Sequence, residues 1–241
     1  MSGWLSDLKR WWLLQHLADP RFRFMWDPPP ADEWVALDCE TTGLDRRRDE
    51  IVAIAAVRIR GNRVMCSERL ELLVRPERRS VATGSVRVHQ LRERDLAQGL
   101  AAEAAVQSLL HFIGSRPLVG YYLEFDVAMI DRVLFPMLGM GLPQPKIEVS
   151  ALYYDHVNRR RSPHLRHGDI DLRFAAIMTA LDLPQRPAHD ALDDAVMAAL
   201  AFVKLNALSD PTRPRRRGPS PSAPAAPGTP PAPAAPGGFG R

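Results

Sequence analysis

The amino-acid sequence predicts an α/β fold around a mixed β-sheet, and two patterns along its 241 residues predict it. Three strand-like stretches, at residues 34–40, 51–59 and 63–74, follow one another over short connections, which favours an antiparallel meander. From residue 101 onward helical and strand-like stretches alternate, as they do where crossover helices join parallel strands. Together the patterns predict a sheet with antiparallel and parallel pairs, flanked by helices.

Each element has its own local signal. The mainly apolar run at 34–40 is typical of a buried strand, and Arg60, Gly61 and Asn62 predict a turn between the second and third strands. The remaining expected elements are a helix over 101–113, a short strand over 117–121, and helices over 127–138, 172–181 and 191–208. Residues 147–157 fit more than one assignment, which stays open.

Composition divides the chain into three parts. Residues 1–30 are expected to form an amphipathic helical appendage, 31–207 the main domain, and 208–241 a tail rich in proline, alanine and arginine. The tail has too little periodic apolar content to offset the entropy of ordering, about 1–2 kcal/mol per residue, so we expect it to be disordered.

Two interpretations of residues 1–30 stay open. Tryptophans and leucines recur there at helical spacing until Asp19 and Pro20 interrupt the pattern. Such a helix could pack on the main domain. Alternatively it could contact a protein partner or a membrane surface, which the neighbouring Lys9 and Arg10 would favour.

Composition also excludes several classes of protein. Cys39 and Cys66 are the only cysteines, too few for a disulfide framework. No stretch reaches the roughly 20 apolar residues that span a bilayer, and Lys9 and Arg10 interrupt the apolar run that a secretory signal would need. These observations predict a cytoplasmic location.

The most informative motif is a pair of carboxylates, Asp38 and Glu40, at the end of the first predicted strand. Residues two apart in a strand point to the same side, so both carboxylates share one face. Two further acids come later in the sequence. Asp126 precedes a predicted helix, where it could be a helix cap instead. Asp194 continues through Ala198 and Ala201 as a helical stripe suited to facing the sheet.

The four acids together point to metal-dependent chemistry. Carboxylates that converge at about 6 Å repel by roughly 3 kcal/mol per pair at an effective dielectric near 20, and protons or cations relieve that repulsion. Hard oxygen ligands favour Mg²⁺ or Mn²⁺, and two such ions can clamp a phosphodiester for hydrolysis. His189, in the loop before the last helix, is the candidate general base.

Net charge adds a weak argument for a polyanionic substrate. The tail holds the whole formal charge of +4, because its five arginines stand against one aspartate, so the body of the chain is neutral. With the four candidate ligand acids set aside, the body is positive by four. The arginines at 159–161 and Arg166 could follow a phosphate backbone or lie in a solvated loop.

Over residues 33–206 the chain resembles the DnaQ-like 3′–5′ exonucleases, in the branch called DEDDh, which includes the proofreading epsilon subunit of bacterial DNA polymerase III. Three motifs carry the resemblance: Asp38, Cys39, Glu40 at the first strand, Phe125, Asp126 at the third acid, and the stretch from His189 to Asp194. The chain departs from the pattern at Tyr121 and Tyr122, where relatives often have histidine and asparagine, and at Ala53 and Ala55, where many have glutamate and glycine.

The resemblance implies a ribonuclease H-like sheet and a role for each matching residue. Asp38, Glu40 and Asp194 would bind the first metal ion, Asp38 would also hold the second, and Asp126 would position the water shell of the second. His189 would be the base. Thr41 and Phe125 match positions that line the terminal nucleotide, and His89 lies in another stretch that resembles a substrate-facing one.

The sequence thus predicts a two-metal-ion 3′–5′ exonuclease that uses Mg²⁺ or Mn²⁺ and releases nucleoside monophosphates from the 3′ ends of single-stranded DNA. An RNA exonuclease of the same chemistry is the near alternative, because discrimination of the 2′-hydroxyl depends on pocket geometry. A non-catalytic interaction scaffold is the alternative of another class. The proline-rich tail favours a stand-alone exonuclease over a replicative epsilon subunit.

Overall fold

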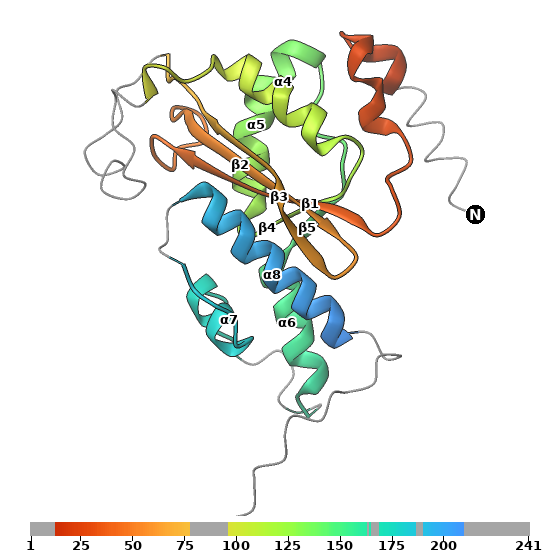
Figure 1. Ribbon diagram of the computed structural model, residues 1–241, viewed down its shortest axis with the longest axis vertical. Helices are drawn as coiled ribbons and strands as arrows, with labels where there is room; N and C mark the ends of the chain where they lie inside the picture. The colour runs from red at the N-terminus through yellow and green to blue at the C-terminus, as the bar shows by residue number, and fades with distance from the viewer. Residues whose placement is uncertain (1–12, 78–95, 163, 165–168, 187–189, 210–241) are drawn as a thin grey trace, which may run out of the picture. The chain divides into compact units, whose positions relative to one another are not determined.

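The computed structural model describes residues 13–77, 96–162, 164, 169–186 and 190–209. A five-stranded sheet in the order β3-β2-β1-β4-β5 forms its centre (Figure 1). The strands are β1 (Glu33–Thr41), β2 (Ile51–Arg60), β3 (Arg63–Leu73), β4 (Leu118–Gly120) and β5 (Lys146–Glu148). The first three pair antiparallel and the last two run parallel to β1, which confirms the predicted meander and the mixed sheet.

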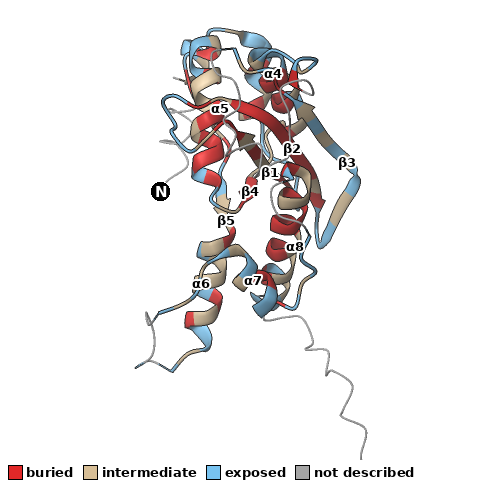
Figure 2. Ribbon diagram, turned by 90° about the vertical axis from the view of Figure 1, so that its left-hand side faces the viewer, coloured by how far each residue is buried: buried red, intermediate tan, exposed pale blue. Residues whose placement is uncertain are grey.

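Helices cover both faces of this sheet. On one face α4 (Ala102–Ile113) and α5 (Leu123–Leu138) enclose a core with alternate residues of β1 such as Leu37. On the other face lies α8 (Ala191–Ser209), which packs with α6 (Val149–Arg160) and α7 (Phe174–Ala180). Figure 2 shows the buried residues concentrated on the strands and on the helix faces turned toward them.

Small side chains line the face of α8 that meets the sheet. Ala195, Ala198 and Ala201 are buried there, and Leu205 continues the stripe that begins at Asp194. The helix packs across β1 and β2, so its first turn lies beside the carboxyl end of β1. The stripe predicted from the sequence therefore faces the sheet.

Part of the N-terminal segment contributes to the core. A 3₁₀-helix, η1 (Pro20–Trp26), begins where the sequence analysis expected only an interruption, because Asp19 caps it and Pro20 occupies its first turn. Leu17, Phe22 and Met25 are buried against α4 and α5. Their apolar surface is therefore used within the domain. The tryptophans before residue 13 lie outside the described residues.

The start of α5 differs from the sequence-based expectation. The helix begins at Leu123, four residues before the predicted start, so Asp126 lies in its first turn and is not its cap. The reason is non-local: the carboxylate of Glu148 accepts the N–H of Leu123 at 3.0 Å, a capping interaction supplied from β5. Tyr122 holds the cap position itself, in the left-handed region at φ 59°.

The ambiguous stretch at 147–157 contains both kinds of element. It starts in β5 and continues directly as α6, whose N-cap Glu148 also accepts the N–H and hydroxyl of Ser150 at 3.1 and 2.8 Å. One carboxylate therefore caps two helices. Among the described helices, none is long and apolar enough to cross a membrane.

Candidate metal centre

Strand β1 sets two carboxylates side by side. Asp38 pairs with Ala55 and Glu40 with Ala53 on β2, which places all four side chains on the sheet face that α8 covers. Leu37 and Cys39 point to the opposite face and are buried in the other core. The alternation predicted from the sequence is therefore confirmed, and it leaves the two acids on the side of α8.

Helix α8 brings the third acid to this pair. Asp38, Glu40 and Asp194 each offer a carboxylate oxygen, and these oxygens lie within 4.8 Å of one another. Asp190 caps the helix, since its Oδ1 accepts the N–H groups of Leu192 and Asp193 at 3.0 Å. Asp193 turns outward and pairs with Arg186 at 2.5 Å. Of the three aspartates around this turn, only Asp194 belongs to the oxygen cluster.

Asp126 approaches the same place from the other face of the sheet. It is 4% exposed in the first turn of α5. The charge of Asp126 raises the pKa of Asp38, and the charge of Glu40 raises the pKa of Asp126. Asp126 therefore interacts with the same group of acids. Gly120, at the end of β4, allows this approach: a Cβ there would lie 2.9 Å from Leu123 Cδ1 and 3.2 Å from the carbonyl oxygen of Leu37.

The carboxylates carry unusual proton affinities. Burial, and then the charges of Asp126 and Asp194, raise the pKa of Asp38 well above its ordinary value. Burial likewise raises the pKa of Asp126, although backbone N–H groups of Cys39 and Asp126 oppose the shift. Burial and the charges of Asp194 and Asp190 raise the pKa of Glu40 to about 7. Near neutral pH the group therefore holds protons unless a cation replaces them.

The donor set suits a divalent cation of the magnesium class. The charges that act most strongly on Asp38 and Glu40 are those of other carboxylates, so these oxygens lie in a negative environment. Carboxylate oxygens grouped from different elements are the hard ligands that Mg²⁺ and Mn²⁺ prefer. The residues present therefore fit such an ion.

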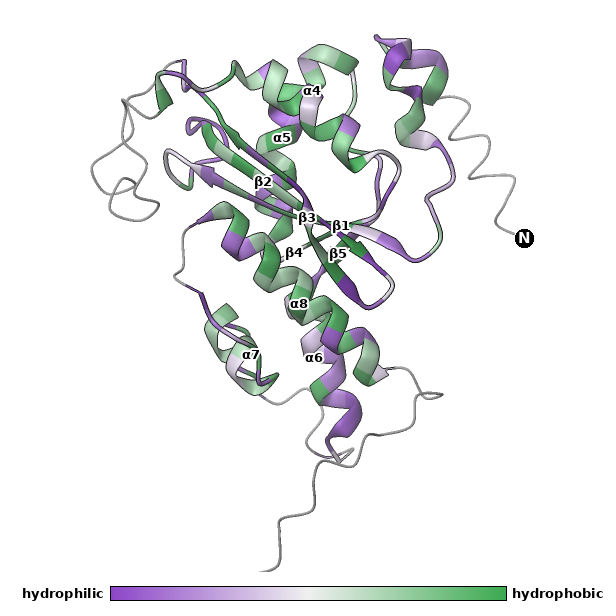
Figure 3. Cartoon of the chain, in the orientation of Figure 1, coloured by the Kyte–Doolittle hydropathy of each residue, from purple (hydrophilic) through white to green (hydrophobic). Residues whose placement is uncertain are grey.

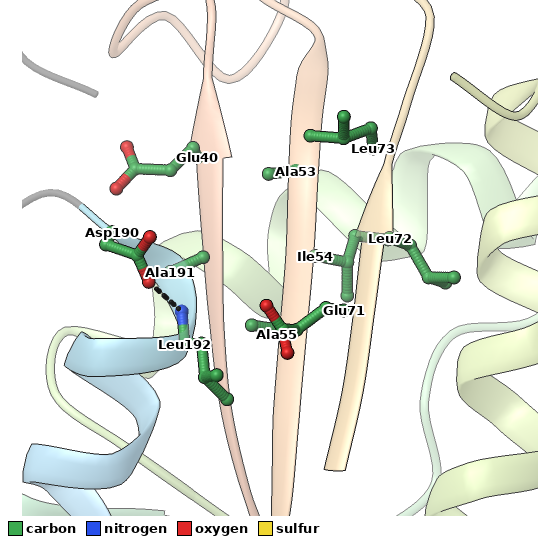
Figure 4. A pocket seen from close by; sticks show the side chains of 10 residues that line it. All are labelled: Glu40, Ala53, Ile54, Ala55, Glu71, Leu72, Leu73, Asp190, Ala191 and Leu192. Atoms are coloured by element: carbon green, nitrogen blue, oxygen red, sulfur yellow. Dashed lines mark hydrogen bonds between the residues drawn. The ribbon is translucent and has the colours of Figure 1, made fainter. Parts of the chain in front are cut away.

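A cavity of about 270 Å³ adjoins the cluster on the side of β2 and β3. Figure 4 shows Glu40 and Asp190 at one end, with the small side chains of Ala53 and Ala55 between them and the side chains of β3. At the positions where many DnaQ-like relatives have glutamate and glycine, this chain thus has two methyl groups that line open space. Glu40 borders that space.

The loop after β1 is fixed by a buried aspartate that the sequence analysis overlooked. Asp49 is 5% exposed, and its carboxylate accepts the hydroxyl of Thr42 at 3.0 Å and the N–H of Asp45 at 2.8 Å. Gly43 lies against the same carboxylate, where a Cβ would come within 2.5 Å of Oδ2. Arg132 of α5 donates to the carbonyl oxygens of Arg46 and Asp49, so the loop is tied to the helix that carries Asp126.

The two predicted nucleotide contacts that the structure describes lie beside the acids. Thr41 ends β1, is 9% exposed, and donates its hydroxyl to the carbonyl of Gly43 at 2.6 Å. Phe125 is 8% exposed beside Asp126, with the guanidinium of Arg46 5.8 Å from its ring centre. His189 and His89 lie outside the described residues, so their predicted roles remain predictions.

The two tyrosines that depart from the family pattern have different environments. Tyr121 packs inward: its ring stacks on Phe174 at 4.5 Å and its hydroxyl donates to the carbonyl of Leu172. Tyr122 is 65% exposed and lies parallel to Phe125, with ring centres 6.4 Å apart. A non-glycine residue with an aromatic side chain and positive φ is uncommon, and such strain occurs often at functional sites. This signal becomes visible only with backbone coordinates.

Curated proteins of similar sequence are named as DNA polymerase III proteins. The chain is 29% identical over 182 residues to a DNA polymerase III subunit epsilon-like protein of Rhodobacter capsulatus, covering 73% of this chain and 24% of that protein. It is 27% identical to the PolC-type DNA polymerase III of Thermotoga maritima, covering 71% of this chain and 12% of that protein. Against the DNA polymerase III subunit epsilon of Aquifex aeolicus it is 25% identical and covers 79% of that protein. The chain thus spans less than a quarter of the length of the first two of these relatives.

Solved structures show the same fold. Exonuclease I of E. coli, in complex with a dT13 oligonucleotide, matches with a TM-score of 0.59 and 17% identity over 72% of this chain and 40% of that one. Exonuclease X, in complex with duplex DNA that has a 5′ overhang, matches with a TM-score of 0.55 and 21% identity over 73% of this chain and 92% of that one. The ribonuclease H-like exonuclease fold expected from the sequence is therefore confirmed.

The family model RNase_T, described as exonuclease, matches residues 35–202, which include Asp38, Glu40, Asp126 and Asp194. That match covers more than half of the chain, and it extends from Val35 in β1 to Phe202 in α8. The chain therefore belongs to the RNase_T exonuclease family.

Proposed function

We propose that this protein is a 3′–5′ exonuclease that depends on two divalent cations and removes nucleoside monophosphates from single-stranded DNA. The observation that carries the proposal is the convergence of Asp38, Glu40 and Asp194 to within 4.8 Å, with Asp126 coupled to them. Holding four carboxylates together costs free energy because they repel one another. In an exonuclease domain, a catalytic role for the four acids accounts for that cost.

Each acid has a role in this proposal. Asp38, Glu40 and Asp194 would hold one ion, and Asp38 and Asp126 would serve a second. Bound Mg²⁺ or Mn²⁺ would supply Lewis acidity at the scissile phosphate and favour ionisation of water. His189, in the chain segment just before α8, would take the proton of the attacking water, a role typically worth about 10² to 10⁴ in rate.

Aromatic and cationic groups beside the acids would hold the terminal nucleotide. Phe125 lies next to Asp126, Arg46 covers its ring, and Tyr122 extends the same surface into solvent. Aromatic rings stack on bases of any sequence, and a nearby cation attracts the phosphate. Thr41 ends β1, the strand that carries Asp38 and Glu40.

The comparisons support DNA as the substrate. Exonuclease I and exonuclease X were solved with DNA, and the curated relatives are DNA polymerase III proteins. RNA remains the alternative of the same chemistry, and matched DNA and RNA oligomers separate the two.

The first prediction concerns direction and metal dependence of cleavage. With Mg²⁺ or Mn²⁺, a 3′-labelled DNA strand should release its label at once as a mononucleotide, while a 5′-labelled strand gives a ladder that shortens one nucleotide at a time. Asp126→Asn should lower kcat at least about a thousandfold, because several kcal/mol of charge stabilisation depend on the metal site. Early release of the 5′ label, or no release from any DNA or RNA strand, contradicts the proposal.

His189→Ala should remove the ascending limb of the pH-rate profile near neutrality.

The second prediction concerns metal binding. In a thermal unfolding experiment at pH 8, Mg²⁺ or Mn²⁺ should stabilise the wild type, by about 2.7 kcal/mol at one hundred times Kd. Asp194→Asn should raise the stability of the metal-free protein, since it removes one repelling charge, and should abolish most of the metal-induced gain. Asp193→Asn is the matched control: it alters the adjacent acid, paired outward with Arg186, and should keep the gain. Equal metal responses in both variants would refute the assignment of Asp194.

The third prediction concerns the pH dependence of stability without metal. The pKa of Glu40 is raised from 4.5 to about 7 in the folded state, so between these values the folded protein binds more protons than the unfolded chain. Its contribution to the free energy of unfolding therefore falls as pH rises through this window. His156 acts in the opposite direction because its pKa is lowered, so the measurement is the difference between wild type and Glu40→Gln in urea with a chelator. A difference that does not change between pH 5 and pH 8 would argue against the raised pKa of Glu40.

The fourth prediction concerns Tyr122. Asparagine tolerates the left-handed conformation, so in Tyr122→Asn the relief of strain offsets the lost ring contact and stability changes by less than about 1 kcal/mol. KM for a DNA strand should rise about tenfold, because stacking on one base is worth about 1–3 kcal/mol. Phe135→Ala, which removes a similarly exposed ring at the other end of α5, should leave KM unchanged. An unchanged KM in Tyr122→Asn would exclude Tyr122 as a nucleotide contact.

A further inference from the structure

A second cavity lies at the far end of the helical layer, away from the acids. It has a volume of about 390 Å³ and is formed where α6, α7 and α8 meet. Tyr153, Leu181 and Leu208 contribute apolar surface, and Arg160, Arg161 and Lys204 contribute cations. We call this the basic pocket. Figure 3 shows that the last turns of α6 are hydrophilic, whereas most of α8 is hydrophobic.

The cations of the basic pocket are oriented by carbonyl groups. Lys204 Nζ donates to the carbonyl of Asp182 at 3.3 Å, and Arg161 donates to the carbonyl of Asp169 at 3.0 Å. Arg160 forms no ion pair with any residue that the structure describes. A carbonyl oxygen directs the Lys204 ammonium without cancelling its charge, and Asp182 is the one carboxylate among the described residues that line the pocket. The pocket therefore keeps a positive balance.

His156 also lines the basic pocket, and its pKa reflects the positive charge there. It is 7% exposed, and its pKa is lowered by burial and then by the charges of Arg160 and Arg159. The same positive field that disfavours protonation of His156 favours an anion.

Two of the three helices that form the pocket, α6 and α8, begin at the metal centre. Glu148, the N-cap of α6, acts on Asp126, and Asp194 lies in the first turn of α8. Lys204 follows Asp194 by ten residues, which is about 15 Å along a helix. Figure 1 shows α6 and α8 continuing together away from the sheet, and the two helices are in contact. The basic pocket is thus held at a fixed distance from the acids.

We propose that the basic pocket binds backbone phosphates of the substrate strand upstream of its 3′ end. The inference rests on the proposed function and adds a second contact for the same strand. At a rise of about 3.4 Å per stacked nucleotide, 15 Å corresponds to four or five nucleotides of a stacked strand. The cations attract the backbone, and the apolar surface around Tyr153 accepts a base, the combination found in single-strand grooves.

The experiment compares two substrates and two double variants of the full-length protein. Arg160→Gln with Lys204→Gln removes two pocket cations, and Arg23→Gln with Arg63→Gln removes two exposed cations elsewhere. One substrate is an oligothymidylate of about 20 nucleotides, which is longer than the strand that one single-strand-binding fold usually covers. The other is the p-nitrophenyl ester of thymidine 5′-monophosphate, which is too short to reach the pocket.

We expect the pocket variant to raise KM for the long strand severalfold and leave hydrolysis of the ester unchanged. The slope of log KM against log salt should become shallower by about 1.4, since each phosphate contact on a single strand contributes about 0.7. The control variant should match the wild type in both. An unchanged KM, an equal effect of the control variant, or an equal loss on both substrates would overturn the proposal.

Two further measurements separate this inference from the proposed function. Binding of a fluorescent oligothymidylate to Asp126→Asn, with and without the pocket substitutions, reports on the pocket even if no turnover is found. Thermal stabilisation by thymidine 5′-monophosphate that the pocket substitutions abolish, with strand binding unaffected, would assign the pocket to a free nucleotide and overturn the proposal.

Discussion

Mutual repulsion among four carboxylates is the constraint around which this domain is organised. Asp38 and Glu40 come from one strand, Asp126 and Asp194 from helices on opposite faces of the sheet, and burial raises the proton affinity of Asp38, Glu40 and Asp126. Such a group stays together only if its supports are stronger than the repulsion. Those supports are the paired strands, the buried faces of α5 and α8, and the hydrogen bonds of Asp49 and Glu148.

Much of this arrangement could be predicted from local sequence patterns. The alternation of Asp38 and Glu40 and the small-residue stripe after Asp194 follow from the periods of a strand and a helix, and both are confirmed. The meander needed only short loops and apolar runs. The cap at Asp190 is a local feature of the same kind, because an aspartate before a helix accepts the first free N–H groups.

What the sequence could not show depends on contacts between distant segments. Nothing near Leu123 resembles a cap, because the acceptor is Glu148 from another strand, and the helix start was therefore placed too late. Asp49 looks like any loop acid until its burial against Thr42 and Gly43 is seen. The strain at Tyr122 and the pocket between α6 and α8 likewise exist only once the chain is folded.

The double cap at Glu148 has a mechanical consequence. Its two carboxylate oxygens hold the first turn of α5 and the first turn of α6 to one point. A displacement at the far end of α6 is therefore resisted at Glu148, which also holds the first turn of α5, where Asp126 lies. Under the proposed function, tension on a strand held at the basic pocket would reach the acids through Glu148, and a homologue without an acid at this position would need another contact to hold the two helices together.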